Sequence, residues 1–105
     1  MLNEAQLIGR VGNDPESRYT PSGSMVVNLS LATTRHYKNK QTNEKVEETE
    51  WHRVVAFGRL AEIIMEYVKK GRLIRIVGRI RTQSWEKDGV KRYSTEIMCS
   101  PHPWG

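Results

Sequence analysis

The chain has 105 residues, enough for one domain with a single hydrophobic core. Its formal charge of +5, from 17 lysines and arginines against 12 acids, favours a polyanionic partner without identifying one. The single cysteine, Cys99, excludes an internal disulfide and is typical of a reducing compartment. No apolar run approaches the ~20 residues of a membrane-spanning helix, and the first residues do not read as a leader peptide. We therefore expect a cytoplasmic protein that does not bind membranes.

Charge is distributed unevenly along the chain. Residues 68–92 contain nine lysines and arginines and two acids, a net charge of +7, whereas the rest of the chain nets −2. A solvated surface usually mixes both signs, so this chain is polarised by segment. The acids outside the basic segment gather at Glu44, Glu47, Glu48 and Glu50. We interpret that acidic run as a solvated loop.

The first half of the chain reads as strands and turns. Weak alternation over residues 5–12 predicts a strand that, at its two glycines, either bends or is closely approached by another segment. Turn-forming residues dominate 13–23, and residues 25–34 alternate as a second strand. The inward positions of that strand are Val27, Leu29 and Leu31. The polar stretch 35–49 has no helical stripe, and we expect it to form a long flexible hairpin tip.

A third strand is predicted over residues 50–57, where period-two alternation returns. One face carries Trp51, Arg53, Val55 and Phe57. The other face carries His52, Val54 and Ala56. We expect Val54 and Ala56 to face the core, so that the two aromatic rings and Arg53 point away from it.

One amphipathic helix follows this strand. Its apolar residues recur with the helical spacing i, i+3, i+4, i+7 and i+8. They are Leu60, Ile63, Ile64, Tyr67 and Val68. Lys69 and Lys70 are expected in the last helical turn, and Gly71 in the left-handed C-terminal cap.

The next strand, residues 72–82, brings three arginines onto one face of a sheet, because successive side chains alternate between faces. One face carries Ile74, Ile76, Gly78 and Ile80. The other carries Arg75, Val77, Arg79 and Arg81. Asp88 and Gly89 predict a hairpin turn within residues 85–93, and residues 93–99 read as the last strand before two prolines.

These elements predict an all-β fold with one helix. A single helix between the third and fourth main strands of a short β chain is the arrangement of the five-stranded OB-fold barrel, here with an extra β-hairpin. We assign residues 1–100 to this OB-fold domain and residues 101–105 to a short irregular C-terminal tail.

Rings and cations are interleaved in a way that suits single-stranded DNA. Such DNA exposes a charged backbone and unstacked base faces, so sequence-independent binding needs cations along a groove and aromatic rings on which bases stack. The interleaved pairs are Tyr37 with Lys38, Trp51 with Arg53, Phe57 with Arg59, and Trp85 with Arg81. A lone aromatic residue in a strand is more often part of the core. An arginine on the same face argues against this, because arginine is rarely fully buried.

Several segments closely resemble the bacterial single-stranded DNA-binding protein family. They are LIGRVGNDPE (7–16), LSLATT (29–34), TEWHRVVAFGRLAE (49–62), YVKKG (67–71) and GRIRT (78–82), followed by Trp85. The resemblance is collinear over residues 3–98. It implies a homotetramer of OB folds with single-stranded DNA wrapped around it, in the bacterial cytoplasm at the nucleoid. The implied roles are protection of single-stranded DNA in replication, recombination and repair.

The resemblance also implies which residues contact DNA. The stacking positions are Trp51, Phe57, Trp85 and Tyr37, of which Tyr37 stands where the family commonly has tryptophan. The phosphate-contact positions are Arg53, Arg59, Lys70 and Arg81, with Arg18 as a weaker match. Many family members have uncharged residues at positions 75 and 79, so the resemblance does not imply contacts there. We add Arg75 and Arg79 as candidate phosphate contacts from the sequence alone. His52 corresponds to a histidine at a subunit interface of the family.

The C-terminus departs from the family. Family members extend the last strand past the position of Met98 and end in an acidic tip that recruits replication and repair proteins. Residues 100–105 contain two prolines and no acid. We expect no partners recruited through an acidic tail, and a shortened last strand that weakens the barrel or its oligomer. The sequence leaves open whether the chain is naturally short or truncated.

Other functions are less well supported. The sequence has no glycine-rich phosphate loop, no motif of paired carboxylates and no nucleophile with an evident base, so we do not expect an enzyme. Its three histidines lack metal-ligand spacing, and we expect no metal or other cofactor. Three alternatives stay open: a primosome-type OB-fold dimer that binds single-stranded DNA and assists helicase loading, an RNA- or tRNA-binding OB module, and a structural oligomer.

Overall fold

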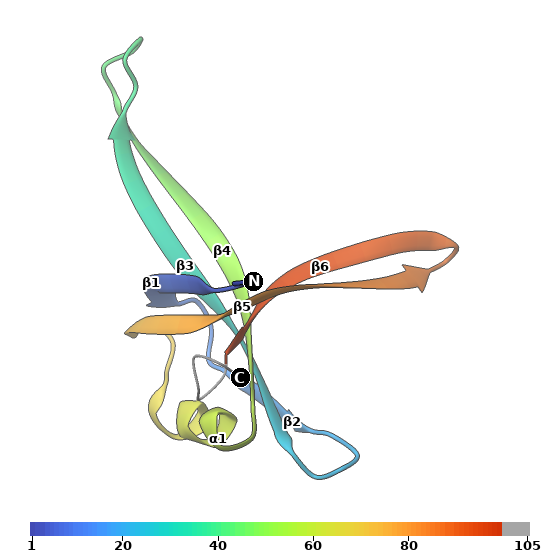
Figure 1. The fold of residues 1–105 in the computed structure, drawn as a ribbon. Helices are drawn as coiled ribbons and strands as arrows, with labels where there is room; N and C mark the ends of the chain where they lie inside the picture. The colour runs from blue at the N-terminus through green and yellow to red at the C-terminus, as the bar shows by residue number, and fades with distance from the viewer. Residues whose placement is uncertain (100–105) are drawn as a thin grey trace.

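The computed structural model describes residues 1–99, which form six strands and one helix (Figure 1). In chain order they are β1 (Ala5–Val11), β2 (Glu16–Tyr19), β3 (Met25–Lys38), β4 (Lys45–Phe57), α1 (Gly58–Tyr67), β5 (Leu73–Lys87) and β6 (Val90–Cys99). The predicted tail at residues 101–105 lies outside the described residues. Within residues 1–99, no helix is both long and apolar enough to cross a bilayer.

Five of the strands close into a barrel. Hydrogen-bonded neighbours run in the order β1-β5-β6-β4-β3, and β1 also pairs with β3 to complete the ring. The β4–β6 pair is parallel and the other pairs are antiparallel. Strand β2 lies outside the ring, on the free edge of β3. A closed, mixed five-stranded barrel with one helix confirms the predicted OB-fold class.

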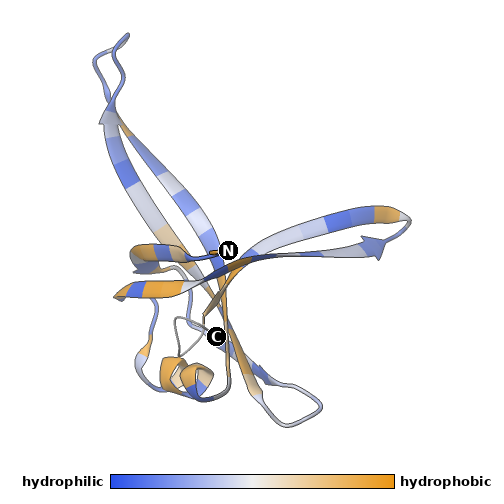
Figure 2. Cartoon of the chain, viewed as in Figure 1, coloured by the Kyte–Doolittle hydropathy of each residue, from blue (hydrophilic) through white to orange (hydrophobic). Residues whose placement is uncertain are grey.

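The barrel is filled from the inner faces of its strands and from α1. Figure 2 shows apolar residues on α1 and on the parts of the strands near the barrel, whereas the outer parts of the hairpins are mostly hydrophilic. The buried cluster consists of Val11, Val27, Leu29, Leu31, Val54, Ala56, Ala61, Ile64, Ile76 and Ile97. The predicted inward positions of β3 and β4 are therefore confirmed, because period-two alternation follows the pleat.

Two glycines allow the strands to cross closely where the barrel closes. A Cβ at Gly9 would collide with the carbonyl oxygen of Ala32 on β3, and a Cβ at Gly78 would collide with that of Met98 on β6. Glycine inside a strand often marks such an approach of one backbone to another. Of the two expectations for the first strand, a bend or a close approach, the structure shows the close approach, of β3 at Gly9.

The buried face of α1 differs from the predicted stripe. Ala61 and Ile64 face the core, whereas Ile63 and Tyr67 are 41% and 59% exposed. The side of α1 that packs against the barrel is centred on the small, fully buried Ala61 and does not include Ile63. The helix ends at Tyr67, and the N–H of Val68 donates to the carbonyl of Ile64 at 2.9 Å.

The residues after the helix form a turn, not a helical end. Lys69 and Lys70 follow the last helical residue, so the prediction that they occupy the last turn was wrong. Gly71 has a φ of +89°, but it lies in the turn that leads to β5. Its N–H donates to the carbonyl of Val11 at 2.7 Å, which ties this turn to the end of β1.

Two long hairpins project from the barrel: the β3–β4 arm and the β5–β6 arm (Figure 1). In the β3–β4 arm, ladder pairing continues to Lys38 and Lys45, so the flexible tip predicted over residues 35–49 shrinks to residues 39–44. Polar pairs hold these strands: Arg35 and Glu48 are 3.3 Å apart, and the hydroxyls of Thr34 and Thr49 are 3.1 Å apart. Both faces of this arm are polar, so its sequence shows no apolar–polar alternation. The length of the arm therefore could not be predicted from that pattern.

The β5–β6 arm turns where the sequence predicted. Asp88 and Gly89 have φ values of 53° and 76°, which suit a two-residue hairpin turn. The predicted extra hairpin is formed by the outer ends of β5 and β6, without additional strands. Strand β2 was not predicted, because all four of its residues are exposed and carry no apolar alternation.

Candidate nucleic-acid interface

Four neighbouring barrel strands present one continuous outer face. Directly paired residues in a sheet project to the same side. The pairs that define this side are Ala32 with Trp51, Ser30 with Arg53, Val55 with Met98, Arg81 with Glu96, and Trp85 with Arg92. We call it the outer face: the side of β3, β4, β6 and β5 that carries Trp51, Arg53, Arg81 and Trp85. The register therefore brings Trp51 and Trp85, which are 34 positions apart in the sequence, onto one face.

The aromatic rings on the outer face are open to solvent. Trp51 is 62% exposed, Trp85 45% and Phe57 38%. The aliphatic residues that form the core of this barrel are at most 9% exposed, several-fold less than these rings. The reading of these rings as ordinary core residues is therefore excluded, and their faces are accessible to a planar ligand.

The indole of Trp51 lies against Gly12 at the end of β1. A Cβ at position 12 would collide with the six-membered ring of the indole and lie 2.9 Å from Oγ of Ser30. The N–H of Gly12 donates to the carbonyl of Ser30 at 2.8 Å, which fixes the backbone at this contact. Gly12 thus positions Trp51, a role that sequence reasoning missed because it depends on the contact between β1 and β3.

A small apolar cluster lies under the same face. Val26, Val55 and Met98 are each less than a tenth exposed and pack together outside the main core. Val55 shares a strand face with Trp51, Arg53 and Phe57, as alternation predicts, but its side chain is buried. Register pairs Val26 with Phe57 and Met98 with Arg79, so both of these larger side chains sit beside the cluster.

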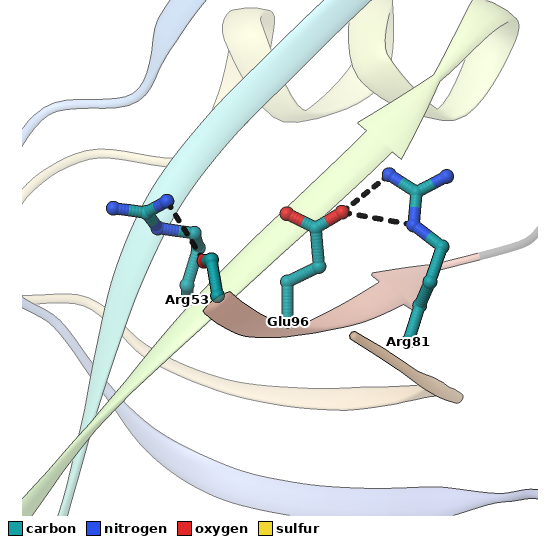
Figure 3. A network of polar contacts seen from close by, with 4 residues as sticks. Arg53, Arg81 and Glu96 are labelled. Atoms are coloured by element: carbon teal, nitrogen blue, oxygen red, sulfur yellow. Dashed lines mark hydrogen bonds and ion pairs between the residues drawn. The ribbon is translucent and has the colours of Figure 1, made fainter. Parts of the chain in front are cut away.

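Two arginines of the outer face differ in their partners (Figure 3). Arg81 pairs with the carboxylate of Glu96, using Nε at 3.0 Å and Nη2, and its side chain is only 34% exposed. Glu96 is 6% exposed and needs this partner, since a buried carboxylate without one is costly. Arg53 donates to Oγ of Ser94 at 3.1 Å, and within residues 1–99 it forms no ion pair. Arg53 therefore keeps its positive charge uncompensated.

The remaining predicted cations are spread more widely. Arg18 on β2 pairs with Val26, and Arg79 pairs with Met98, so both share the outer face and are exposed. Arg59, at the start of α1, is paired with Glu62 at 3.3 Å.

Two further cations lie beyond the part of the outer face formed by β3, β4 and β6. Lys70 is exposed in the turn after α1, where its backbone N–H donates to Oδ1 of Asp14 at 3.0 Å. Arg75 projects to the same side of β5 as Arg79 and Arg81, as predicted, but beside β1: it pairs with the exposed Ile8 and donates to Oε1 of Gln6 at 2.9 Å.

Tyr37 and His52 lie on the other side of the β3–β4 ladder. Tyr37 pairs with Val46 and His52 with Leu31, so both alternate with the outer-face residues. The Arg35 guanidinium lies 4.9 Å from the centroid of the Tyr37 ring, which is 43% exposed. His52 is half-buried, with Nε2 2.8 Å from the hydroxyl of Thr33.

A groove next to Trp51 adds residues that the sequence did not single out. Its volume is about 380 Å³. It is lined by Asn13, Glu16, Asn28, Leu29, Ser30, Trp51, His52 and Arg53. The alternation of β3 already placed Asn28 and Ser30 on the outward side, but only the register shows that they lie between Trp51 and β2.

Cys99 lies away from this groove. It lines a largely apolar cavity of about 330 Å³ between α1 and the barrel. Burial raises the pKa of its thiol to about 11. The thiol therefore stays protonated at neutral pH and is a poor nucleophile.

Comparisons with known proteins agree with this geometry. Residues 2–101 match the single-strand binding protein family. A Plasmodium falciparum SSB in complex with ssDNA shares 34% sequence identity and a TM-score of 0.87, with 96% of this chain and 89% of that chain covered. A deletion mutant of the single-stranded DNA-binding protein from Thermus aquaticus shares 35% identity and a TM-score of 0.79, with 93% of this chain covered. This chain spans only 47% of that protein.

Members of the family bind DNA and are not enzymes, in agreement with the lack of a catalytic motif in the sequence. The match covers nearly all of the described residues and includes the barrel, both arms and the outer face. The chain belongs to the single-strand binding protein family.

Proposed function

We propose that this chain binds and protects single-stranded DNA in replication, recombination and repair, with little dependence on sequence. The observation that carries the proposal is the exposure of Trp51, Phe57 and Trp85 on the face that also presents Arg53. Bases of any kind stack on aromatic rings, and cations hold the backbone that connects them. The related Plasmodium falciparum protein was observed in complex with ssDNA, which supports the same ligand here.

The proposed phosphate contacts depend on where each cation lies and on whether it forms an ion pair within the protein. We propose Arg18, Arg53 and Arg79 as the principal contacts, because they are exposed on the outer face. Arg81 would reach phosphate only with donors that Glu96 leaves free. Arg59, Lys70 and Arg75 would contact strand segments that leave this face, as would the ring of Tyr37.

We further propose that the protein acts as a homotetramer in the bacterial cytoplasm, with His52 near a subunit interface. The support is the family resemblance and the exposure of apolar side chains such as Ile8 and Leu73, 62% and 55% exposed on the adjacent β1–β5 surface. Sedimentation at micromolar concentration tests the assembly. A stable tetramer supports the proposal, whereas a dimer would favour the primosome-type alternative.

The salt dependence of binding tests the proposed DNA contacts. Labelled oligo-dT is titrated with protein at several salt concentrations, and binding is followed by fluorescence anisotropy. Each phosphate contacted should contribute about −0.7 to the slope of log affinity against log salt. An affinity that does not change with salt would contradict the basic outer face as the binding surface.

A further inference from the structure

The groove beside Trp51 has the shape and the chemistry of a site for one nucleobase. We propose that it takes a base with an exocyclic amino group, cytosine in preference to thymine, and that the carboxylate of Glu16 makes this choice. The inference rests on the proposed function and refines it: binding stays tolerant of sequence along most of the strand, with a modest preference at one position in each subunit.

The walls of the groove come from three strands. Glu16 on β2 pairs with Asn28 on β3, and Ser30 on β3 pairs with Arg53 on β4, so their side chains project to the outer face. The Trp51 indole, held by Gly12, stands at one side. The volume of about 380 Å³ falls within the ~300–1,000 Å³ typical of small-molecule sites. A base stacked on Trp51 would have its polar edge directed at β2 and β3.

Hydrogen bonds within the protein leave the Glu16 carboxylate available. Oδ1 of Asn13 accepts from both the N–H and the hydroxyl of Ser30, at 3.1 and 2.6 Å, so its acceptor capacity is used. The ion pairs within residues 1–99 join Arg35 to Glu48, Arg59 to Glu62 and Arg81 to Glu96, and none involves Glu16. The groove therefore contains one free anionic acceptor next to a stacking ring.

An acceptor of this kind distinguishes the two pyrimidines. An ionised carboxylate only accepts hydrogen bonds. The N4 amino group of cytosine donates to it, which is the usual pairing of Glu with cytosine, whereas thymine presents the O4 carbonyl at the same place. Two acceptors facing each other repel, so thymine would have to turn or leave the pocket. Arg53, on the opposite side of the groove, retains guanidinium donors for a carbonyl or a phosphate of the same nucleotide.

The simpler reading is that Glu16 is a solvated surface charge that repels the DNA backbone. That reading predicts the same effect of Glu16 on every base, because phosphates are common to all strands. The pocket predicts an effect that depends on the base. Substitution of Glu16 by glutamine keeps the size of the side chain and adds a donor that can satisfy thymine O4.

The experiment compares oligo-dC with oligo-dT on wild-type protein and on Glu16→Gln. The oligonucleotides have about eight nucleotides, within the span of one OB fold. We expect the ratio of dissociation constants, dC over dT, to rise about three- to tenfold in Glu16→Gln, because a charge-assisted hydrogen bond to cytosine becomes a neutral one and thymine gains a donor. Glu66→Gln removes an equal charge from the exposed side of α1 and should leave the ratio unchanged.

The outcomes separate this inference from the function on which it rests. If Glu16→Gln changes the affinity for both oligonucleotides by the same factor, the pocket does not select a base, and DNA binding itself stands. If wild-type protein binds neither oligonucleotide, the proposed function fails. Glu16 is exposed on β2, and thermal melting of each variant confirms that the fold is retained.

Discussion

The β3–β4 arm and the β5–β6 arm are both regular antiparallel ladders that extend beyond the barrel, and we compare one exposed ring expected to stack on DNA from each, Tyr37 and Trp85. Trp85 projects to the outer face, together with Trp51 and Arg53. Tyr37 projects to the opposite side of its ladder, and Arg35 covers part of its ring. Interleaving with cations in the sequence suggested a stacking role for both rings, but the register places them on different faces.

The difference teaches how a closed barrel assembles a binding surface. Residues i and i+2 share a face, and pairing transfers that face from strand to strand. A ring therefore belongs to the outer face only if its position has the right parity in an unbroken ladder. Trp85 meets this condition through β6, and Tyr37 does not.

The largest effect is expected from the two outer-face tryptophans. Trp51→Ala and Trp85→Ala should each weaken binding of oligo-dT by about 1–3 kcal/mol, because each removes one stacked base. Anisotropy of a labelled oligonucleotide measures the loss without relying on intrinsic fluorescence. If Trp85→Ala binds oligo-dT with wild-type affinity, the β5–β6 arm does not contact DNA. Trp85 and Tyr37 would then not differ in their contribution to binding.

Arg81 should matter for folding as well as for DNA. Arg81→Gln leaves the buried Glu96 carboxylate without its partner, and we expect a loss of about 1–3 kcal/mol in the free energy of unfolding, less than for a fully buried pair because Arg81 is partly exposed. Urea denaturation measures it. The double variant Arg81→Gln/Glu96→Gln should recover part of the loss. Equal stability of wild type and Arg81→Gln would show that the pair does not hold the base of the β5–β6 arm.

Arg53, on β4, should matter for DNA binding but not for folding, in contrast to Arg81. Arg53→Gln should leave the free energy of unfolding within about 0.5 kcal/mol of wild type, since only a hydrogen bond to Ser94 at an exposed site is altered. It should reduce the salt slope of oligo-dT binding by about 0.7, the contribution of one phosphate contact. An unchanged slope would mean that Arg53 does not touch the backbone.

The smallest effect is expected at Tyr37. Tyr37→Ala should weaken oligo-dT binding by less than about 1 kcal/mol, because the ring lies off the outer face and Arg35 already occupies part of its π surface. The same anisotropy titration applies, with Tyr19→Ala as a matched control on another exposed tyrosine. A loss as large as that of Trp85→Ala would show that the DNA path includes both sides of the β3–β4 arm.

The sequence predicted the parts of the fold in which one face is buried. Val27, Leu29 and Leu31 alternate because they fill the barrel, and the turn at Asp88 and Gly89 follows from backbone conformations that few residues tolerate. Strand β2 and the length of the β3–β4 arm escaped prediction, because polar side chains on both faces leave no periodic signal.

For the site, the residue types were predictable and their grouping was not. Trp51, Arg53 and Phe57 share a strand face by simple alternation, but Trp85 joins them only through the pairing of β5, β6 and β4. The support of Trp51 by Gly12 and the groove that contains Glu16 both depend on contacts between strands far apart in the sequence. Pairwise register is the information that a single sequence lacks.

The most direct test of the account observes Trp51 while DNA binds. In a Trp85→Phe/Trp104→Phe variant, Trp51 is the only tryptophan and reports emission from the outer face alone. Saturation with oligo-dT, verified by anisotropy of the labelled strand, should quench that emission strongly because a base stacks on the exposed indole. Full binding with unchanged Trp51 emission would show that the DNA follows another surface.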